Sequence, residues 1–193
     1  MKNEDIIAFF DRWASGWDAD MIRDDGKIGF ILDAAHVVSG TRVLDIACGT
    51  GVLFPDYLAR SVSHVDAVDI SPEMARIAAQ KAAGSCISVH CGDAQSLSLP
   101  GAYDCCVIYN AFPHFTQPEK LIAHLAAQLR TGGTLCIAHS MSLNALHQHH
   151  ERARSVSREM FTAEALGAMM APYFDMETLI SDEEKFVVAG KKR

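Results

Sequence analysis

The 193-residue sequence lacks several features that would mark it as a particular class of protein. Its six cysteines include no C-x-x-C pair, so we expect neither a zinc site of that type nor a disulfide framework. We interpret them as small buried hydrophobic side chains in a reducing compartment. No apolar run is long enough to cross a membrane, and the acidic N-terminus lacks the apolar core of a signal peptide. We therefore expect a cytoplasmic protein without membrane insertion.

Basic residues are also few. The 17 Lys and Arg side chains stand against 24 Asp and Glu side chains, which gives a net charge of −7. The acidic surplus is dense in residues 1–25. A surface of this sign repels phosphate backbones, so we expect no nucleic-acid partner. Histidine, by contrast, is frequent: the chain has nine, and four lie within twelve positions, at His139, His147, His149 and His150.

Short apolar runs alternate with helix-like stretches along the chain. Their near-continuous apolarity is typical of parallel strands that are buried on both faces. The alternation predicts right-handed crossovers and a doubly wound α/β fold. We predict strands at Arg42–Ala47, Val65–Ile70, Ile87–His90, Tyr103–Asn110 and Thr134–His139, and a closing antiparallel hairpin formed by Met176–Ser181 and Lys185–Gly190.

Helix signals fill the intervals between these strands. Ser71 and Pro72 predict a helix start, since serine caps and proline suits the first helical position. The glycine pair at 132–133 predicts a helix stop just before the next strand. We predict further helices over residues 3–14, 22–38, Gln117–Leu129, 140 to about 159, and Thr162–Met170.

The most informative stretch is V-L-D-I-A-C-G-T-G at residues 43–51. It predicts a strand that runs into a glycine turn and then into a helix. Gly49 and Gly51 would let a ligand approach the backbone without interference from a Cβ atom. In open α/β sheets ligands bind outside the carboxyl ends of the strands, which is where this loop would lie.

Two more acids follow the second and third predicted strands. Asp69 lies 20 positions after Gly49 and could accept hydrogen bonds from both hydroxyls of a ribose. Asp93 follows the third strand and could accept from the exocyclic amine of adenine. For Asp93, a simple turn-forming Gly-Asp pair is the alternative.

A dinucleotide dehydrogenase would require G-x-G-x-x-G, and here Phe54 occupies the position of the third glycine. Asp45, inside the first strand, would be a poor neighbour for a pyrophosphate but suits a ligand with a cationic end. A nucleotide-dependent oxidoreductase is therefore a weaker hypothesis.

These motifs, V-L-D-I-A-C-G-T-G, then V-D-I-S, then G-D-A, closely resemble those of the class I S-adenosylmethionine (SAM) methyltransferases, in particular the UbiE-like small-molecule branch. The resemblance covers roughly residues 5–140. It implies a Rossmann-like, mostly parallel seven-stranded sheet with an N-terminal helical cover and a C-terminal antiparallel hairpin. It also implies one domain over residues 1–193, with a helical lid at 1–40, a cofactor-binding core at 41–139 and a substrate cover with the final strands at 140–193.

The resemblance assigns cofactor roles to individual residues. Gly49 and Gly51 would pack against the cofactor, and Asp45 would support its methionine amino end. Asp69 would hold the ribose. The remaining cofactor residues would be Asp93 and Ala94 at the adenine, Ile70 and Met74 on the adenine ring, Trp17 closing over SAM, and Asn110 at the carboxyl end of the fourth strand.

Catalytic candidates follow the fourth and fifth predicted strands. His114 and His139 would meet at one mouth, and either could act as a general base near neutral pH. Alternatively, His139, His147 and His150, with Glu151, would form a divalent-metal site for a chelating substrate. A solvated polar helix with incidental histidines is the third interpretation.

We therefore expect SAM-dependent methyl transfer to a small acceptor that is apolar or metal-chelating, by a monomer or homodimer. SAM would be the cofactor, with a divalent metal as a second candidate. The alternative is a non-catalytic module on the same fold that binds SAM or a metal.

Overall fold

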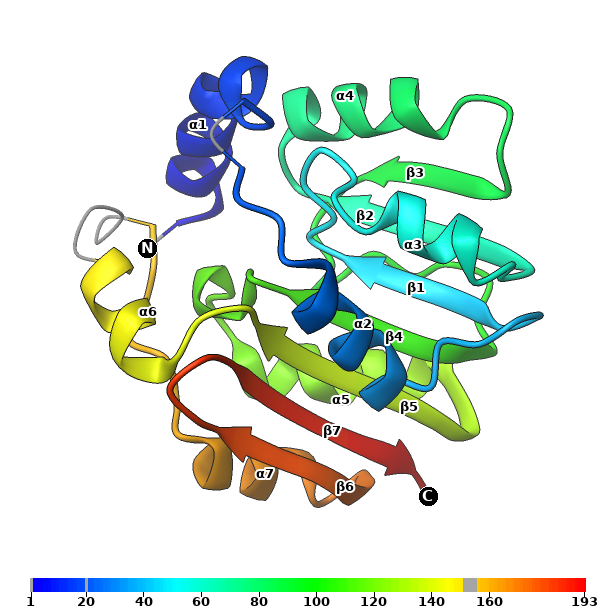
Figure 1. The fold of residues 1–193 in the computed structure, drawn as a ribbon, viewed down its shortest axis with the longest axis vertical. Coiled ribbons are helices and arrows are strands. Elements are labelled where there is room, and N and C mark those ends of the chain that lie inside the picture. The colour runs from blue at the N-terminus through cyan, green and yellow to red at the C-terminus, as the bar shows by residue number, and fades with distance from the viewer. Residues whose placement is uncertain (1, 20, 151–155) are drawn as a thin grey trace.

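The computed structural model describes residues 2–19, 21–150 and 156–193, apart from the side chains of residues 147–150. Its strands form one sheet in the order β3-β2-β1-β4-β5-β7-β6 (Figure 1). The strands are β1 (Arg42–Ile46), β2 (His64–Asp69), β3 (Ile87–Cys91), β4 (Tyr103–Tyr109), β5 (Leu129–His139), β6 (Phe174–Ser181) and β7 (Phe186–Lys192).

Strands β1 to β5 run parallel, and β7 lies antiparallel between β5 and β6. The predicted seven-stranded, mostly parallel sheet with an antiparallel C-terminal hairpin is therefore confirmed. Because the parallel strands point the same way, the loops that follow β1 to β5 share one edge of the sheet, which we call the carboxyl edge.

Helices cover both faces of the sheet. One core packs α2, α3 and α4 on one face, and the other packs α5 and α7 on the opposite face. Figure 1 shows α1 and α6 beyond the carboxyl edge. The helices are α1 (Asn3–Trp13), η1 (Ala14–Gly16), α2 (Asp25–Ala34), α3 (Phe54–Ala59), α4 (Pro72–Ala82), η2 (Phe112–His114), α5 (Pro118–Gln128), α6 (Leu143–His150) and α7 (Ala163–Met170).

Helix starts follow the capping signals in the sequence. The Ser71 hydroxyl accepts a hydrogen bond from the Met74 amide at 3.1 Å, as predicted for α4. The second predicted helix, 22–38, is too long. It begins at Asp25 because the Asp24 carboxylate caps it, and it ends at Ala34, two residues before His36 adopts a left-handed φ of 56°.

The start of β5 also differs from the prediction. The helix α5 ends at Gln128, and the strand begins at Leu129, which pairs with Tyr103. Pairing resumes at Thr134 and Cys105, so residues 130–133 form an irregular bulge with Gly132 at φ +78°. The glycine pair therefore lies inside the strand. It forms the bulge in β5 and does not stop the helix, because α5 has already ended at Gln128.

The predicted helix over 140–159 is shorter as well. Helix α6 ends at His150, and residues 156–162 are not helical. Residues 151–155 lie outside the described part of the chain. The segment that begins at Val156 contacts η2, since the Arg158 amide donates to the Pro113 carbonyl at 2.9 Å.

All six cysteines are free, as predicted. Cys48, Cys105, Cys106 and Cys136 are buried, but Cys91 is exposed. The prediction of burial is wrong for Cys91 because it ends β3, which is an edge strand. No described helix is long and apolar enough to span a membrane.

Candidate functional site

The glycine loop between β1 and α3 lies at the carboxyl edge. Gly49 and Gly51 have left-handed φ angles of +55° and +87°. A Cβ atom on Gly51 would come within 2.6 Å of the Phe54 ring, so the loop packs tightly there. A Cβ atom on Gly49 would meet nothing within 4 Å. The loop therefore leaves open space beside Gly49 for a ligand, while Phe54 fills the place of the third dinucleotide glycine.

Asp45 lies in β1 beneath this loop and is 2% exposed. Its Oδ2 atom has no hydrogen-bond partner among the described residues. Burial raises its pKa to about 8, the nearby charge of Asp69 adds to the effect, and the Tyr57 hydroxyl opposes it. A buried carboxyl of this kind fits a ligand that brings a positive charge, because the ligand would satisfy the oxygen and favour its charged form.

Asp69 ends β2 beside the glycine loop. Its Oδ2 accepts from the Gly49 amide at 2.8 Å, and its Oδ1 accepts from the Ser71 amide at 2.9 Å. Burial raises the pKa of this carboxyl, although the two amides oppose that shift. Asp69 thus joins the loops that follow β1 and β2, and a carboxylate keeps lone pairs for further donors such as hydroxyls.

Asp93 follows β3 and is half-buried. Its Oδ1 accepts from the Gln95 amide at 2.9 Å and from the Gln95 side chain at 3.3 Å. Its Oδ2 accepts from the Asn3 side chain at 2.8 Å. Of the three other residues predicted to contact the adenine, Ala94 and Met74 are buried, and Ile70 is half-buried.

The N-terminal segment packs over these loops. Asp11 accepts from the Ser71 hydroxyl at 2.5 Å, and Asp18 accepts from the Thr50 hydroxyl at 2.6 Å. Trp17 is 38% exposed and lies edge-on to Phe10, with ring centroids 5.6 Å apart. Sequence reasoning missed these polar contacts, since nothing in the local pattern distinguishes Asp11 or Asp18 from the other acids of this segment.

Asn110 and Ser140 fasten the ends of β4 and β5 together. The Asn110 Oδ1 accepts from the Ser140 amide at 2.9 Å, and its Nδ2 donates to the Ser140 hydroxyl at 3.1 Å. Asn110 has a left-handed φ of 55°, a conformation that asparagine tolerates better than most residues. Its side chain is thus held at the carboxyl edge, on the β4 side of the glycine loop.

The two predicted catalytic histidines differ in their surroundings. His114 is half-buried, and its Nδ1 lies 2.8 Å from the Val156 carbonyl oxygen. Its ring is edge-on to Phe10, with centroids 5.0 Å apart. His139 ends β5 and is fully buried, with its ring edge-on to Phe186. His114 ends η2, which follows β4, and β4 and β5 are neighbours, as predicted.

The predicted metal site involves residues that the structure describes only in part. His147 and His150 belong to α6, but their side chains lie outside the described part, as does all of Glu151. Within the described residues, no group of three or more His, Cys, Asp or Glu side chains could hold a metal ion.

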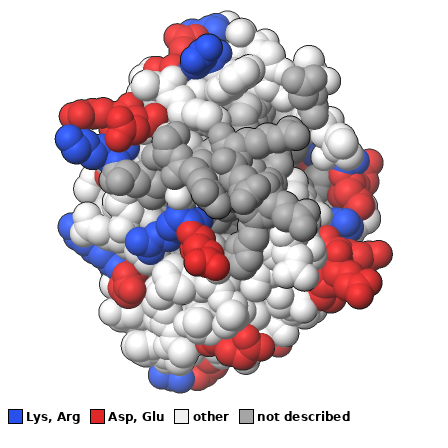
Figure 2. Space-filling model, turned by 90° about the vertical axis from the view of Figure 1, so that its left-hand side faces the viewer, with Lys and Arg blue, Asp and Glu red and all other residues white. Residues whose placement is uncertain are grey.

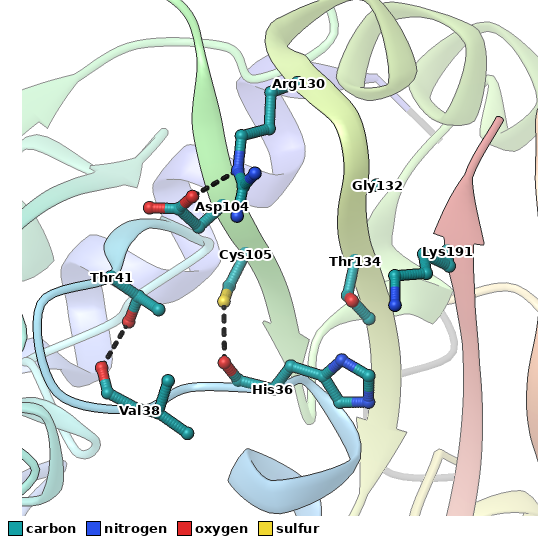
Figure 3. Close-up of a pocket in the computed structure, with 9 residues that line it drawn as sticks. All are labelled: His36, Val38, Thr41, Asp104, Cys105, Arg130, Gly132, Thr134 and Lys191. Carbon is teal, nitrogen blue, oxygen red and sulfur yellow. Dashed lines mark hydrogen bonds and ion pairs between the residues drawn. The ribbon is translucent and has the colours of Figure 1, made fainter.

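A hollow of about 370 Å³ lies at the opposite edge, near the amino ends of β1, β4 and β5 (Figure 3). Its basic side chains already have acidic partners. Arg130 pairs with Asp104, and both His36 and Lys191 reach Glu177, at 3.3 and 4.0 Å. This hollow is remote from the predicted site residues, which gather at the carboxyl edge.

Figure 2 views the molecule from the side that α1 and α6 occupy in Figure 1. Acidic side chains lie mainly towards the margins of this face, in several places beside Lys or Arg side chains. The view shows no broad basic patch outside the grey atoms.

Comparison with known proteins agrees with this geometry. Residues 43–133 match the family described as a methyltransferase domain. A ubiquinone biosynthesis O-methyltransferase from Xanthomonas campestris pv. campestris (strain B100) is 30% identical over 142 residues. The match covers 69% of this chain and 58% of that protein, so the chain spans less than two thirds of the relative's length.

Two solved structures share the fold. The N-methyltransferase NodS from Bradyrhizobium japonicum WM9, in complex with S-adenosyl-L-homocysteine, has a TM-score of 0.74 and 15% identity, over 96% of this chain and 97% of NodS. The [4+2]-cyclase SpnF has a TM-score of 0.66 and 22% identity, over 80% of this chain and 59% of SpnF.

The structural likenesses support the fold alone, since one of these neighbours is named as a cyclase. The matched domain and the curated relatives agree with the resemblance seen in the sequence: residues 43–133 are similar to a methyltransferase domain, and the chain is similar to part of curated O-methyltransferases.

Proposed function

We propose that the protein transfers a methyl group from SAM to a small apolar acceptor with an ionisable hydroxyl. The observation that carries this proposal is the pairing of a buried, unpartnered Asp45 oxygen with open space beside Gly49. A ligand with a cationic amino end would satisfy the acid and fill the space. When bound, SAM supplies an electrophilic methyl group on a sulfonium, so the protein has to align the reactants more than activate the donor.

The chain's own residues would hold the cofactor along the carboxyl edge. Asp45 would accept from its amino group, and Gly49 and Gly51 would let its methionine part approach the backbone. The Asp69 carboxylate would accept from the ribose hydroxyls. The adenine would lie between Asp93, Ala94, Ile70 and Met74, with Trp17 as the cover and Asn110 beside the methionine end.

His114 is our candidate for the general base. The Val156 carbonyl can only accept a hydrogen bond, so the His114 Nδ1 donates to it. The Ser157 hydroxyl also lies 3.1 Å from Nδ1, so we assign the proton-accepting role to the other ring nitrogen, Nε2. His139 is fully buried, so we assign it a supporting position at the end of β5 and not the base itself.

The acceptor chemistry is inferred from Phe10, which contacts His114, and from the aromatic residues that flank His114 in the chain and pack against one another. Phe10 contacts both Trp17 and His114, and Phe112 contacts Phe115 and Phe161. These rings favour an apolar acceptor. The name of the Xanthomonas relative, an O-methyltransferase, supports oxygen as the methylated atom.

We also propose the remaining features that the sequence predicts: a substrate other than nucleic acid, a cytoplasmic location, a monomer or homodimer, and the division into lid, core and cover. The net charge of −7 supports a small uncharged or weakly acidic substrate over a polyanion.

The direct test is to incubate the protein with SAM and a panel of hydroxylated aromatic compounds and to measure S-adenosylhomocysteine (SAH) by mass spectrometry. We expect product with one class of acceptor, and a loss of turnover in His114→Ala that is larger than any change in its SAM affinity. The binding of SAM and the binding of NAD are measured in parallel by calorimetry. Binding of NAD in place of SAM would overturn the proposal, and binding of SAM without turnover on any acceptor would favour the non-catalytic module.

A further inference from the structure

The start of α1 contacts the acid that we assign to adenine. The Asn3 Nδ2 donates to the Asp93 Oδ2 at 2.8 Å, across 90 positions of sequence. The other oxygen of Asp93 is held by Gln95, through both its backbone amide and its side chain. Oδ2 is therefore the oxygen that Asp93 presents away from its own loop, and Asn3 already donates to it.

The donor on Asn3 is chemically equivalent to the donor on adenine. A carboxamide nitrogen and the exocyclic amine of adenine are both planar NH₂ groups on an sp² carbon, and each offers two N–H donors. We propose that Asn3 and the exocyclic amine of adenine compete for the Asp93 Oδ2, so that cofactor binding releases the first turn of α1. This inference rests on the proposed function, which assigns SAM to this edge.

The rest of α1 has its own anchors and need not leave with Asn3. Asp11 accepts from the Ser71 hydroxyl at 2.5 Å and from the Glu73 amide at 3.2 Å. Asp18, beyond the helix, holds the Thr50 hydroxyl and the Lys81 ammonium, each at 2.6 Å. The release is thus confined to the start of the helix, and the lid stays seated over the loops that follow β1 and β2.

Competition has a measurable consequence for affinity. If the Asn3 contact must break before adenine binds, only the molecules without that contact are competent to bind. The apparent affinity for an adenine ligand is then reduced in proportion to the fraction of such molecules. A ligand without the exocyclic amine does not need the Asp93 Oδ2. Removal of the Asn3 donor should therefore favour amine-bearing ligands alone.

The experiment is calorimetry with SAH and with its analogue that carries purine in place of adenine. We expect Asn3→Leu, which keeps the side-chain size but has no donor, to bind SAH about three- to tenfold more tightly than the wild type. Asn3→Asp should act in the same direction, since its charge repels Asp93. Affinity for the purine analogue should stay unchanged in both variants. Glu4→Gln, on an exposed neighbour in the same helix, is the matched control and should bind both ligands as the wild type does.

Unchanged or weaker SAH binding by Asn3→Leu would overturn the inference, because Asn3 would then share Asp93 with adenine or have no part in binding. An equal gain for both ligands would also overturn it, since the effect would be a general loosening of the lid. If neither the wild type nor any variant binds SAH, the proposed function itself fails. If all bind it equally, the proposed function stands and only this inference fails.

Discussion

The Phe10 ring of α1 lies edge-on to the His114 ring, with centroids 5.0 Å apart and planes at 83°. Phe10 also lies edge-on to Trp17, at 5.6 Å. One lid side chain therefore contacts both the proposed cover of the cofactor and the proposed base. The lid and the acceptor side of the site are in physical contact through this ring.

Phe10→Leu should weaken SAH binding, because leucine keeps much of the apolar volume but loses both edge-on aromatic contacts. Such contacts contribute about 0.5–1.5 kcal/mol each beyond burial, so the loss of both corresponds to a Kd increase of roughly five- to 150-fold. Calorimetry with SAH measures this change in Kd. Phe9→Leu is the control, since Phe9 also lies edge-on to the Phe10 ring, and the Kd of this variant should change less. Equal effects of the two variants would show that Phe10 has no special place in the lid.

Ala47→Gly should stabilise the protein. Ala47 lies at the start of the glycine loop with a left-handed φ of 55°, which disfavours any residue with a Cβ atom. Glycine relieves that strain, and we expect the free energy of unfolding to rise by about 1 kcal/mol in urea titrations. Ala111→Gly is the matched control. Its φ of −131° is ordinary, so glycine there should destabilise the protein, and a gain at both positions would contradict the strain argument.

The sheet could be predicted from the sequence because its strands are apolar on both faces and end at turn residues. β1, for example, was predicted as Arg42–Ala47 and ends one residue earlier, at Ile46. The start of β5 could not be predicted. Residues 130–133 carry no strand pattern, and the strand begins at Leu129 only because that residue pairs with Tyr103.

The candidate site also has a part that the sequence predicts and a part that it does not. Asp45, Gly49 and Asp69 belong to local motifs, and the fold brings them together because neighbouring parallel strands end at one edge. The contacts from Asn3 to Asp93 and from Asp11 to Ser71 join residues 60 to 90 positions apart. Each depends on one polar side chain of an exposed helix, so no local pattern marks it.

Asp66→Asn should remove part of the acid sensitivity of the fold. Asp66 is buried in β2, and burial alone would raise its pKa. Hydrogen bonds from His90, Arg42, Tyr103 and His64 outweigh burial and hold the pKa at about 2. Because the folded pKa is below the unfolded value near 4, this carboxylate stabilises the fold above pH 4, and the stabilisation is lost as pH falls from about 4 to about 2.

The loss should amount to about 2–3 kcal/mol for a shift of about two pKa units. We expect thermal unfolding of the wild type to show this fall between pH 4 and pH 2, and Asp66→Asn to be less stable at pH 7 with a flatter acid limb. Glu183→Gln, on an exposed acid of the β6–β7 turn, should keep the wild-type slope. A wild-type slope in Asp66→Asn would assign the acid sensitivity to other carboxyls.

SAH binding should release a proton from Asp45 at neutral pH. Burial, followed by the charge of Asp69, raises the Asp45 pKa to about 8, so this carboxyl is mostly protonated in the free protein at pH 7. The cationic amino group of the ligand favours the carboxylate, so the proton must leave as the ligand binds. Between pH 6 and pH 7.5 the affinity should therefore rise with pH, by up to about tenfold per unit.

Calorimetry in buffers of different ionisation enthalpy measures the released proton directly, and we expect about one per ligand at pH 7 for the wild type. Asp45→Asn should bind SAH at least about tenfold more weakly, release no proton and show a flat pH profile, since an amide can neither titrate nor balance the ligand's charge. Asp33→Asn, on an exposed acid of α2 that pairs with Arg60, should behave as the wild type does. Proton release that persists in Asp45→Asn would place the titrating group elsewhere, with Asp69 as the next carboxyl to substitute, because burial raises its pKa too.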